Sequence, residues 1–86
     1  MKARVFVTLK KTVLDPQGQT ILKALTGLGY QSIKEVRQGK VFELALNGVS
    51  KEQAQEQLEK IARDVLTNPV IEEFRYELEE LAPASP

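Results

Sequence analysis

Apolar and polar residues alternate along residues 2–9, the first regular pattern of the chain. Such alternation predicts a β-strand with one buried face, because successive side chains of a strand point to opposite sides of a sheet. Phe6 falls on the face that should meet solvent, so we predict that it takes part in self-association. The positions predicted to be buried are Ala3, Val5, Val7 and Leu9.

A helix is predicted over residues 16–28. Asp15 can accept a hydrogen bond from a first-turn N–H group, and Pro16 suits the first helical position. Apolar residues then recur with helical spacing. Gly29 is the expected left-handed residue after the helix. The stripe consists of Ile21, Leu22, Leu25 and Leu28.

Strand alternation returns over residues 33–47, with an interruption at "RQGK". The interruption allows two interpretations, a hairpin turn at Gln38-Gly39 or a bend or bulge in one long strand. Both place Phe42 on one face of the strand and Glu43 on the other.

The last part of the chain predicts a second helix and a final strand. Ser50 and Gln53 have the spacing of a capping box, and the "TNP" at residues 67–69 should end this helix. Residues 70–80 alternate again and predict a strand with a charged outer face. The apolar stripe of the helix is Ala54, Leu58, Ile61, Ala62 and Val65.

The predicted order of elements is β-α-β(β)-α-β. This order indicates an α+β fold, with an antiparallel sheet and two helices on one face, ferredoxin-like in outline. We expect one domain over residues 1–81 and a disordered tail over 82–86. A domain of 86 residues has a small core, and oligomerisation is a common remedy.

Composition narrows the chemistry. The chain has no cysteine and no histidine, which removes most zinc sites, cysteine nucleophiles and serine-histidine triads. We therefore expect no catalytic, cofactor-binding or metal-binding residues. No apolar run is long enough to cross a membrane and the start is unlike a signal peptide, so we expect a cytoplasmic protein.

The charges are unevenly distributed, although the net charge is zero. Residues 1–43 carry eight Lys/Arg against three Asp/Glu, and residues 44–86 carry four against nine. Such asymmetry can orient a self-association or a partner. It can also reflect surface charge that differs between two helices.

Two local patterns fail as catalytic or ligand sites. "KKTVLDPQGQT", at residues 10–20, lacks the glycine and lysine spacing of a phosphate loop, and Asp15 would repel an anion at the helix start. The carboxylates of residues 71–81 lie mainly on a solvated strand face. Their spacing is unlike that of a calcium loop.

Two binding functions remain as alternatives. The element order is shared with RNA-recognition motifs, and "RQGKVFEL" has a faint likeness to one of their aromatic signatures. The zero net charge argues against this function. ACT-type regulatory domains share the outline too, and "TVLDPQG" lies about where they bind small effectors.

The chain resembles the PurS family, the small subunit of phosphoribosylformylglycinamidine synthase. The segments that carry the resemblance are "VFVTLKKTVLDPQGQTI" (5–21), "VRQGKVFEL" (36–44) and "LTNPVIEEFRYEL" (66–78). The likeness runs from about residue 2 to 80, with these segments in order and with plausible spacing. Phe74 stands where tyrosine is frequent in the family, which is a conservative difference.

The resemblance implies a bridging role without catalysis. In this family the complex converts formylglycinamide ribonucleotide, ATP and glutamine into formylglycinamidine ribonucleotide, ADP, phosphate and glutamate. A large synthetase subunit uses ATP and Mg²⁺, and a separate glutaminase subunit releases ammonia. The small subunit is similar to a bridge that forms a homodimer or tetramer and helps ammonia pass. No nucleic acid or membrane partner is implied.

The resemblance also marks candidate contact residues. Several have a structural explanation as well: Asp15 as a helix cap, Gly39 as a turn, and Asn68-Pro69 as a helix stop. Arg37 and Lys40 favour a partner contact, because two cations beside a turn suit the rim of an interface. The candidates are Lys10, Asp15, Gln17 and Gly18 in the first motif, Arg37, Gly39 and Lys40 in the second, and Asn68 and Pro69 in the third.

Overall fold

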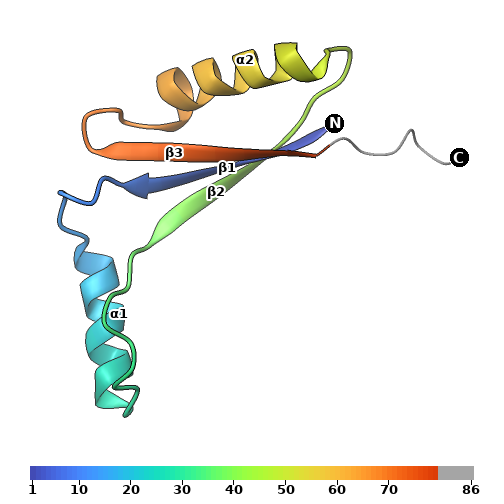
Figure 1. Cartoon of the computed structure of the whole chain (residues 1–86). Helices are drawn as coiled ribbons and strands as arrows, with labels where there is room; N and C mark the ends of the chain where they lie inside the picture. Colours follow the sequence, from blue (N-terminus) through green and yellow to red (C-terminus); the bar gives the residue numbers. More distant parts are fainter. Residues whose placement is uncertain (80–86) are drawn as a thin grey trace, which may run out of the picture.

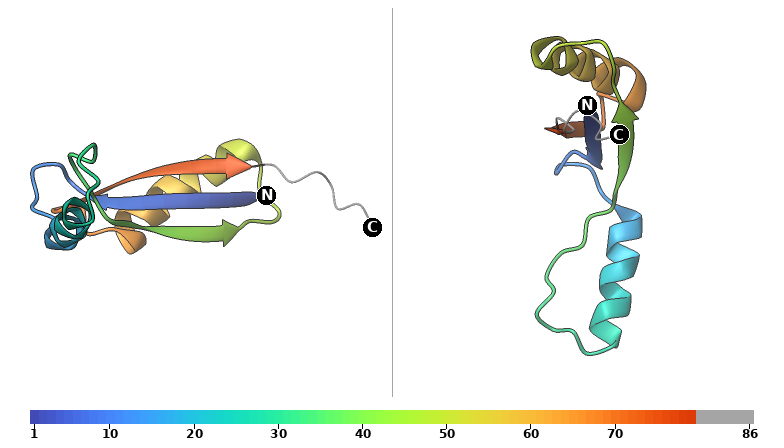
Figure 2. Two further views of the ribbon diagram at one scale, coloured as in Figure 1. Left: turned by 90° about the horizontal axis from the view of Figure 1, so that it is seen from below. Right: turned by 90° about the vertical axis from the view of Figure 1, so that its right-hand side faces the viewer.

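A three-stranded antiparallel sheet forms the centre of the protein in a computed structural model that describes residues 1–79 (Figures 1 and 2). The central strand β1 (Lys2–Leu9) pairs on one side with β2 (Gly39–Ala45) and on the other with β3 (Glu72–Glu79). The antiparallel sheet and the element order β-α-β-α-β confirm the α+β, ferredoxin-like outline. The tail predicted for residues 82–86 lies outside the described residues.

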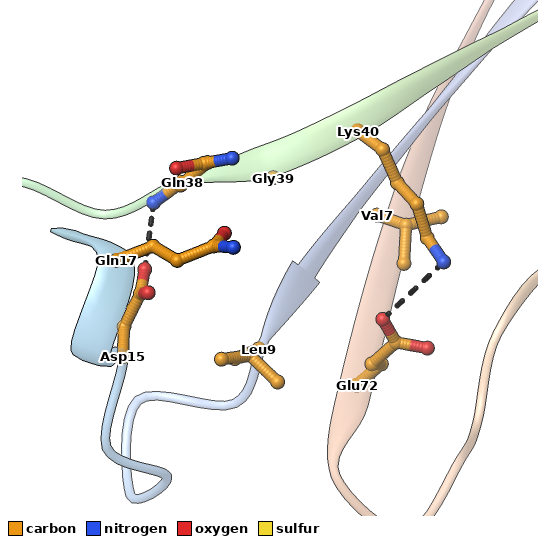
Figure 3. A pocket seen from close by; sticks show the side chains of 8 residues that line it. All are labelled: Val7, Leu9, Asp15, Gln17, Gln38, Gly39, Lys40 and Glu72. Carbon is orange, nitrogen blue, oxygen red and sulfur yellow. Dashed lines mark hydrogen bonds and ion pairs between the residues drawn. The ribbon is translucent and has the colours of Figure 1, made fainter.

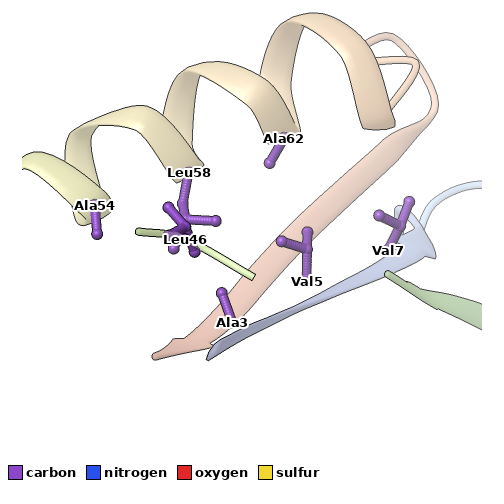
Figure 4. Packing of buried hydrophobic residues seen from close by; sticks show 7 residues of the cluster. All are labelled: Ala3, Val5, Val7, Leu46, Ala54, Leu58 and Ala62. Atoms are coloured by element: carbon purple, nitrogen blue, oxygen red, sulfur yellow. The ribbon is translucent and has the colours of Figure 1, made fainter. Parts of the chain in front are cut away.

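One helix covers one face of this sheet. α2 (Lys51–Ile61) continues into a π-helical turn, η1 (Ala62–Leu66), and lies across the strands (Figure 1). Burial of this apolar layer supplies the main stabilisation of the fold. The buried hydrophobic residues pack together beneath the helix in Figure 4, and they are Ala3, Val5, Val7, Leu46, Ala54, Leu58 and Ala62. We call the sheet with α2 and η1 the lobe.

The first helix does not lie on the sheet. α1 (Pro16–Gly27) points away from one end of the strands, and residues 28–38 return the chain to β2 (Figures 1 and 2). We call residues 16–38 the arm. Only Gly18 is buried in α1, and the Cα radius of gyration is 17.0 Å, against roughly 12 Å for a compact domain of this length. The prediction that two helices lie on one face of the sheet is therefore confirmed for α2 and wrong for α1.

Residues 33–38 are not a strand. β2 begins only at Gly39, so the structure has neither the hairpin nor the long bent strand expected for residues 33–47. A contact with a residue distant in the sequence keeps this segment out of the sheet, because the N–H of Gln38 donates to the Asp15 carboxylate at 2.7 Å. The backbone before Gly39 is therefore held by Asp15 at the start of α1 and leaves the plane of the sheet.

The local start and stop signals are confirmed. Asp15 caps α1, with its carboxylate accepting from the N–H of Gly18, and Gly29 has a positive φ of 99°. Ser50 and Gln53 form the predicted capping box of α2. The helical segment ends at Leu66, directly before the predicted stop at residues 67–69.

The face of the sheet opposite α2 carries the charges of both halves of the chain. Arg4 of β1 faces Glu43 of β2 and Glu77 of β3 across the two ladders. Lys2 forms an ion pair with Glu43 at 3.0 Å. Arg4 belongs to the basic half of the sequence and Glu77 to the acidic half, so the two halves meet within one sheet, where opposite charges on neighbouring strands attract one another.

Candidate functional site

The three motif segments meet at the end of the sheet from which the arm leaves. Leu9 of β1 faces Glu72 of β3, and Thr8 faces Gly39 of β2. The N–H of Lys10 donates to the carbonyl of Ile71 at 2.8 Å, which joins the first and third motifs. We call this region the junction. It contains every candidate contact residue except Phe6, namely Lys10, Asp15, Gln17, Gly18, Arg37, Gly39, Lys40, Asn68 and Pro69.

Asp15 is the most constrained polar group of the junction. Its side chain is 5% exposed, and its two oxygens accept from the N–H groups of Gly18 at 3.0 Å and Gln38 at 2.7 Å. The hydrogen bond from Gln38 and then that from Gly18, with the nearby charge of Arg37, lower the pKa of the carboxyl below its ordinary value of 3.8. Asp15 thus caps the helix and also fastens its start to the chain entering β2.

Two glycines permit close approaches of backbone in the junction. A Cβ atom on Gly18 would lie 2.1 Å from the carbonyl oxygen of Val36, and one on Gly39 would lie 2.5 Å from the carbonyl oxygen of Val7. Real Cβ atoms do not come so near to oxygen, so any other residue would push the segments apart. The motif glycines are therefore explained by packing within the chain.

Arg37 bonds to the loop that precedes the arm. Its Nη2 atom donates to the carbonyl of Leu9 at 3.4 Å and to those of Lys10 and Val13 at 3.0 Å each. All three carbonyls share this one nitrogen, which carries two N–H donors. Arg37 therefore has partners within the chain, although its side chain remains exposed.

Lys40 and the third motif are linked through Glu72. The ammonium group of Lys40 lies 3.7 Å from one carboxylate oxygen of Glu72, and the other accepts from the N–H of Asn68 at 2.7 Å. The side chain of Asn68 accepts in turn from the N–H of Val70. Asn68-Pro69 is thus a structured turn between η1 and β3, as its helix-stop interpretation predicts.

A cavity of about 220 Å³ opens between the arm and the sheet (Figure 3). Gln17 and Gln38 face it from the arm, and Lys40 and Glu72 from the sheet. Val7 and Leu9 also line the cavity, which therefore suits a partner segment with both polar and apolar side chains. Among residues 1–79, no cluster of three or more His, Cys, Asp or Glu side chains could hold a metal ion.

Phe6 lies apart from the junction, on the sheet face opposite α2. The guanidinium group of Arg75 stands 4.0 Å from the centre of its ring, which is a cation–π contact. Val41 is its neighbour on β2 and is 54% exposed. Arg75 of the same chain therefore covers part of the Phe6 ring. We had predicted a cover by a second copy of the chain.

No pattern in the sequence indicates the roles of Val36 and Gln38. Both act through backbone atoms, the carbonyl that Gly18 approaches and the N–H that Asp15 accepts. Backbone groups carry no residue signature, and these contacts join positions about 20 residues apart in the chain. Glu72 was also missed, because an acid on a strand full of acids does not stand out.

Comparison with known proteins identifies the family. A family model described as phosphoribosylformylglycinamidine (FGAM) synthase, PurS, matches residues 2–80. The chain belongs to the PurS family. It is 38% identical to the FGAM synthase subunit PurS of Methanocaldococcus jannaschii, covering 93% of this chain and 96% of the relative. The PurS subunit of Bacillus subtilis is 39% identical, with 93% and 94% covered.

Solved PurS structures have the same fold. The crystal structure of M. jannaschii PurS superposes with a TM-score of 0.84 at 36% identity, covering 94% of this chain and 98% of that chain. It is described as one of the subunits of formylglycinamide ribonucleotide amidotransferase in the purine biosynthetic pathway. A chain in the structure of PurLQS from Thermotoga maritima has a TM-score of 0.81 at 33% identity, with 88% and 93% covered.

PurS membership confirms the predicted function as a subunit of FGAM synthase in purine biosynthesis. It favours this role over the ACT-type and RNA-binding alternatives. The structure adds a reason against base stacking, because Phe42 of the faint RNA-binding signature packs against the core beneath α2. Within residues 1–79, no helix is both long and apolar enough to cross a membrane.

Proposed function

We propose that this PurS chain is a non-catalytic bridging subunit, which joins the glutaminase and the ATP-dependent synthetase of FGAM synthase and assists ammonia transfer between them. The arm is the observation that carries the proposal. Ile21 of α1 is 40% exposed, Leu28 at its C-terminal end 74% and Tyr30 56%, although helices normally bury their apolar residues. Exposed apolar surface of this kind marks an interaction site.

The chemistry then belongs to the partner subunits. Glutamine hydrolysis takes place on the glutaminase, since a chain without cysteine offers no thiolate nucleophile. ATP and Mg²⁺ act on the synthetase, which amidates formylglycinamide ribonucleotide, and this chain binds no cofactor. The complex works in the cytoplasm.

Gln17 and Lys40 are the junction residues best placed to contact a partner. Both side chains face the cavity and are exposed, and the Lys40–Glu72 pair is long at 3.7 Å. A half-exposed ion pair of this length stabilises the fold by at most about 1 kcal/mol. Lys40 can therefore exchange Glu72 for a carboxylate on another subunit at little cost.

Reconstitution tests the bridging role. The purified chain is mixed with the synthetase and glutaminase subunits, and amidation is measured with glutamine and, separately, with ammonium salt. We expect glutamine-dependent turnover to require this chain, because only that reaction needs the two active sites to be coupled. Ammonia-dependent turnover serves as the control. Equal glutamine-dependent rates with and without the chain would refute the proposal.

We also propose that a second copy of the chain covers the arm, in a homodimer or tetramer. Leu28→Ser tests this proposal, because it removes apolar surface that contributes little to the isolated lobe. The mass measured by light scattering should fall towards that of a monomer, while Lys23→Ser on α1 leaves the mass unchanged. A wild-type protein that is already monomeric at tens of micromolar would contradict the proposal.

A further inference from the structure

The arm meets the lobe through a small set of residues that are far apart in the sequence. Asp15 caps α1, Gly18 belongs to its first turn, and Arg37 and Gln38 belong to the chain that returns to β2. Between them, residues 19–35 make no hydrogen bond to the lobe among the bonds found in residues 1–79. The direction of the arm is therefore determined at its base.

Three independent contacts lock this base. The Asp15 carboxylate holds the N–H of Gln38 at 2.7 Å, and Gly18 lets the carbonyl of Val36 come closer than any side chain would allow. Arg37 then holds the carbonyls of the loop that follows β1, at 3.0 to 3.4 Å. Together they tie both ends of the arm to each other and to the end of the sheet.

We propose that Asp15, Gly18 and Arg37 form a latch that sets the direction of the arm relative to the lobe, and that they are positioning residues rather than partner contacts. Asp15 and Gly18 are buried, so neither offers a side chain to another subunit. Arg37 is exposed, but its guanidinium group already bonds to three carbonyls of its own chain. We further expect that loss of the arm's direction impairs glutamine-dependent turnover of the assembled complex. This consequence for assembly rests on the bridging function proposed above.

Asp15→Asn separates the latch from the helix cap. Asparagine caps helices as well as aspartate does, so α1 should keep its helix content by circular dichroism. An amide has one acceptor oxygen and a donor nitrogen. It can therefore serve Gly18 or Gln38, but not both, and one of the two hydrogen bonds is lost.

Spin labels measure the direction of the arm directly. The chain has no cysteine, so Lys23→Cys on α1 and Glu59→Cys on α2 provide unique, exposed labelling positions. Labelled chains are diluted with unlabelled protein, so that only distances within one chain are recorded. We expect one narrow distance distribution in the otherwise unchanged chain, and a clearly broader one after Asp15→Asn or Arg37→Met.

Matched controls lie on η1. Asp64→Asn and Arg63→Met make the same chemical changes at an exposed ion pair, and they should leave the distance distribution narrow. Each protein is then added to the reconstituted complex. We expect the two latch variants to reduce glutamine-dependent turnover at least several-fold, while the controls do not.

The outcomes separate the latch from the bridging function. If the latch variants keep the narrow distribution, the latch is refuted, and a loss of turnover would then make these residues contacts. If they broaden the distribution without loss of turnover, the consequence for assembly is refuted. Should the unchanged chain fail to support turnover at all, the bridging function fails, while the distance measurement still decides the latch.

Discussion

The two amphipathic helices of this PurS chain have similar sequence patterns and opposite surroundings. α2 buries Ala54 and Leu58 completely against the sheet, whereas the only buried residue of α1 is a glycine. Both helices begin with a side-chain cap, so local signals do not distinguish them. The difference shows that an apolar stripe predicts burial but does not say whether the cover comes from the same chain.

The largest expected effect is in the lobe. Leu58→Ala should lower the free energy of unfolding by about 2–5 kcal/mol, because it leaves a cavity in a core that cannot fully collapse. A domain of this size has little stability to spare. Leu25→Ala on α1 is the matched change. Thermal or urea unfolding should show a smaller loss of unfolding free energy for this variant than for Leu58→Ala. Equal losses would contradict the contrast between them.

The next effect is at the base of the arm. Gly18→Ala should cost about 1–3 kcal/mol, because the added methyl group would overlap the carbonyl oxygen of Val36. Gly27→Ala lies in the same helix, and its Cβ would meet open space. That change should be neutral or stabilise the protein by up to about 1 kcal/mol, since alanine favours helix more than glycine does. Urea unfolding of both variants would show whether the base is as tightly packed as the lobe.

The smallest effect depends on pH. Folding lowers the pKa of Asp15, so its carboxylate contributes stability above its ordinary pKa of 3.8, and this contribution disappears as the pH falls through the folded value. The difference in melting temperature between the unchanged chain and Asp15→Asn should therefore narrow below about pH 4.

Glu43 is a second acid whose pKa is lowered by folding, and the comparison of the two proteins removes its effect. Lys2 lowers the pKa of Glu43 by hydrogen bonding and by charge, and Glu43 is present in both proteins. Its contribution therefore cancels in the difference. A difference in melting temperature that stays constant down to pH 2 would show that Asp15 does not act through its charge.

Local features of the fold could be predicted from the sequence. Asp15-Pro16, Gly29 and the Ser50–Gln53 box each act over a few residues, and the structure has all of them. The position of α1 could not be predicted, because it depends on backbone contacts with residues 36–38. Phe6 was singled out correctly as unusual, but its contact with Arg75 requires the register of two strands that are distant in the sequence.

The candidate site was predicted as residues and not as an arrangement. The motif segments contain every junction residue that the resemblance marked. Only the fold shows that Lys10 lies beside Ile71 and Lys40 beside Glu72. Whether Gln17 and Lys40 contact another subunit stays a prediction. Arg37 illustrates the difficulty, since an exposed cation in a motif can serve its own backbone.

The geometry of the arm makes it a lever. A helix of 12 residues is roughly 18 Å long, so a rotation of about 10° at the base moves its far end by roughly 3 Å. A shift of that size is enough to separate side chains that were in contact. A small change of backbone angle around Gly18 therefore becomes a larger displacement at Leu28. This leverage explains why a surface helix needs so tightly packed a base.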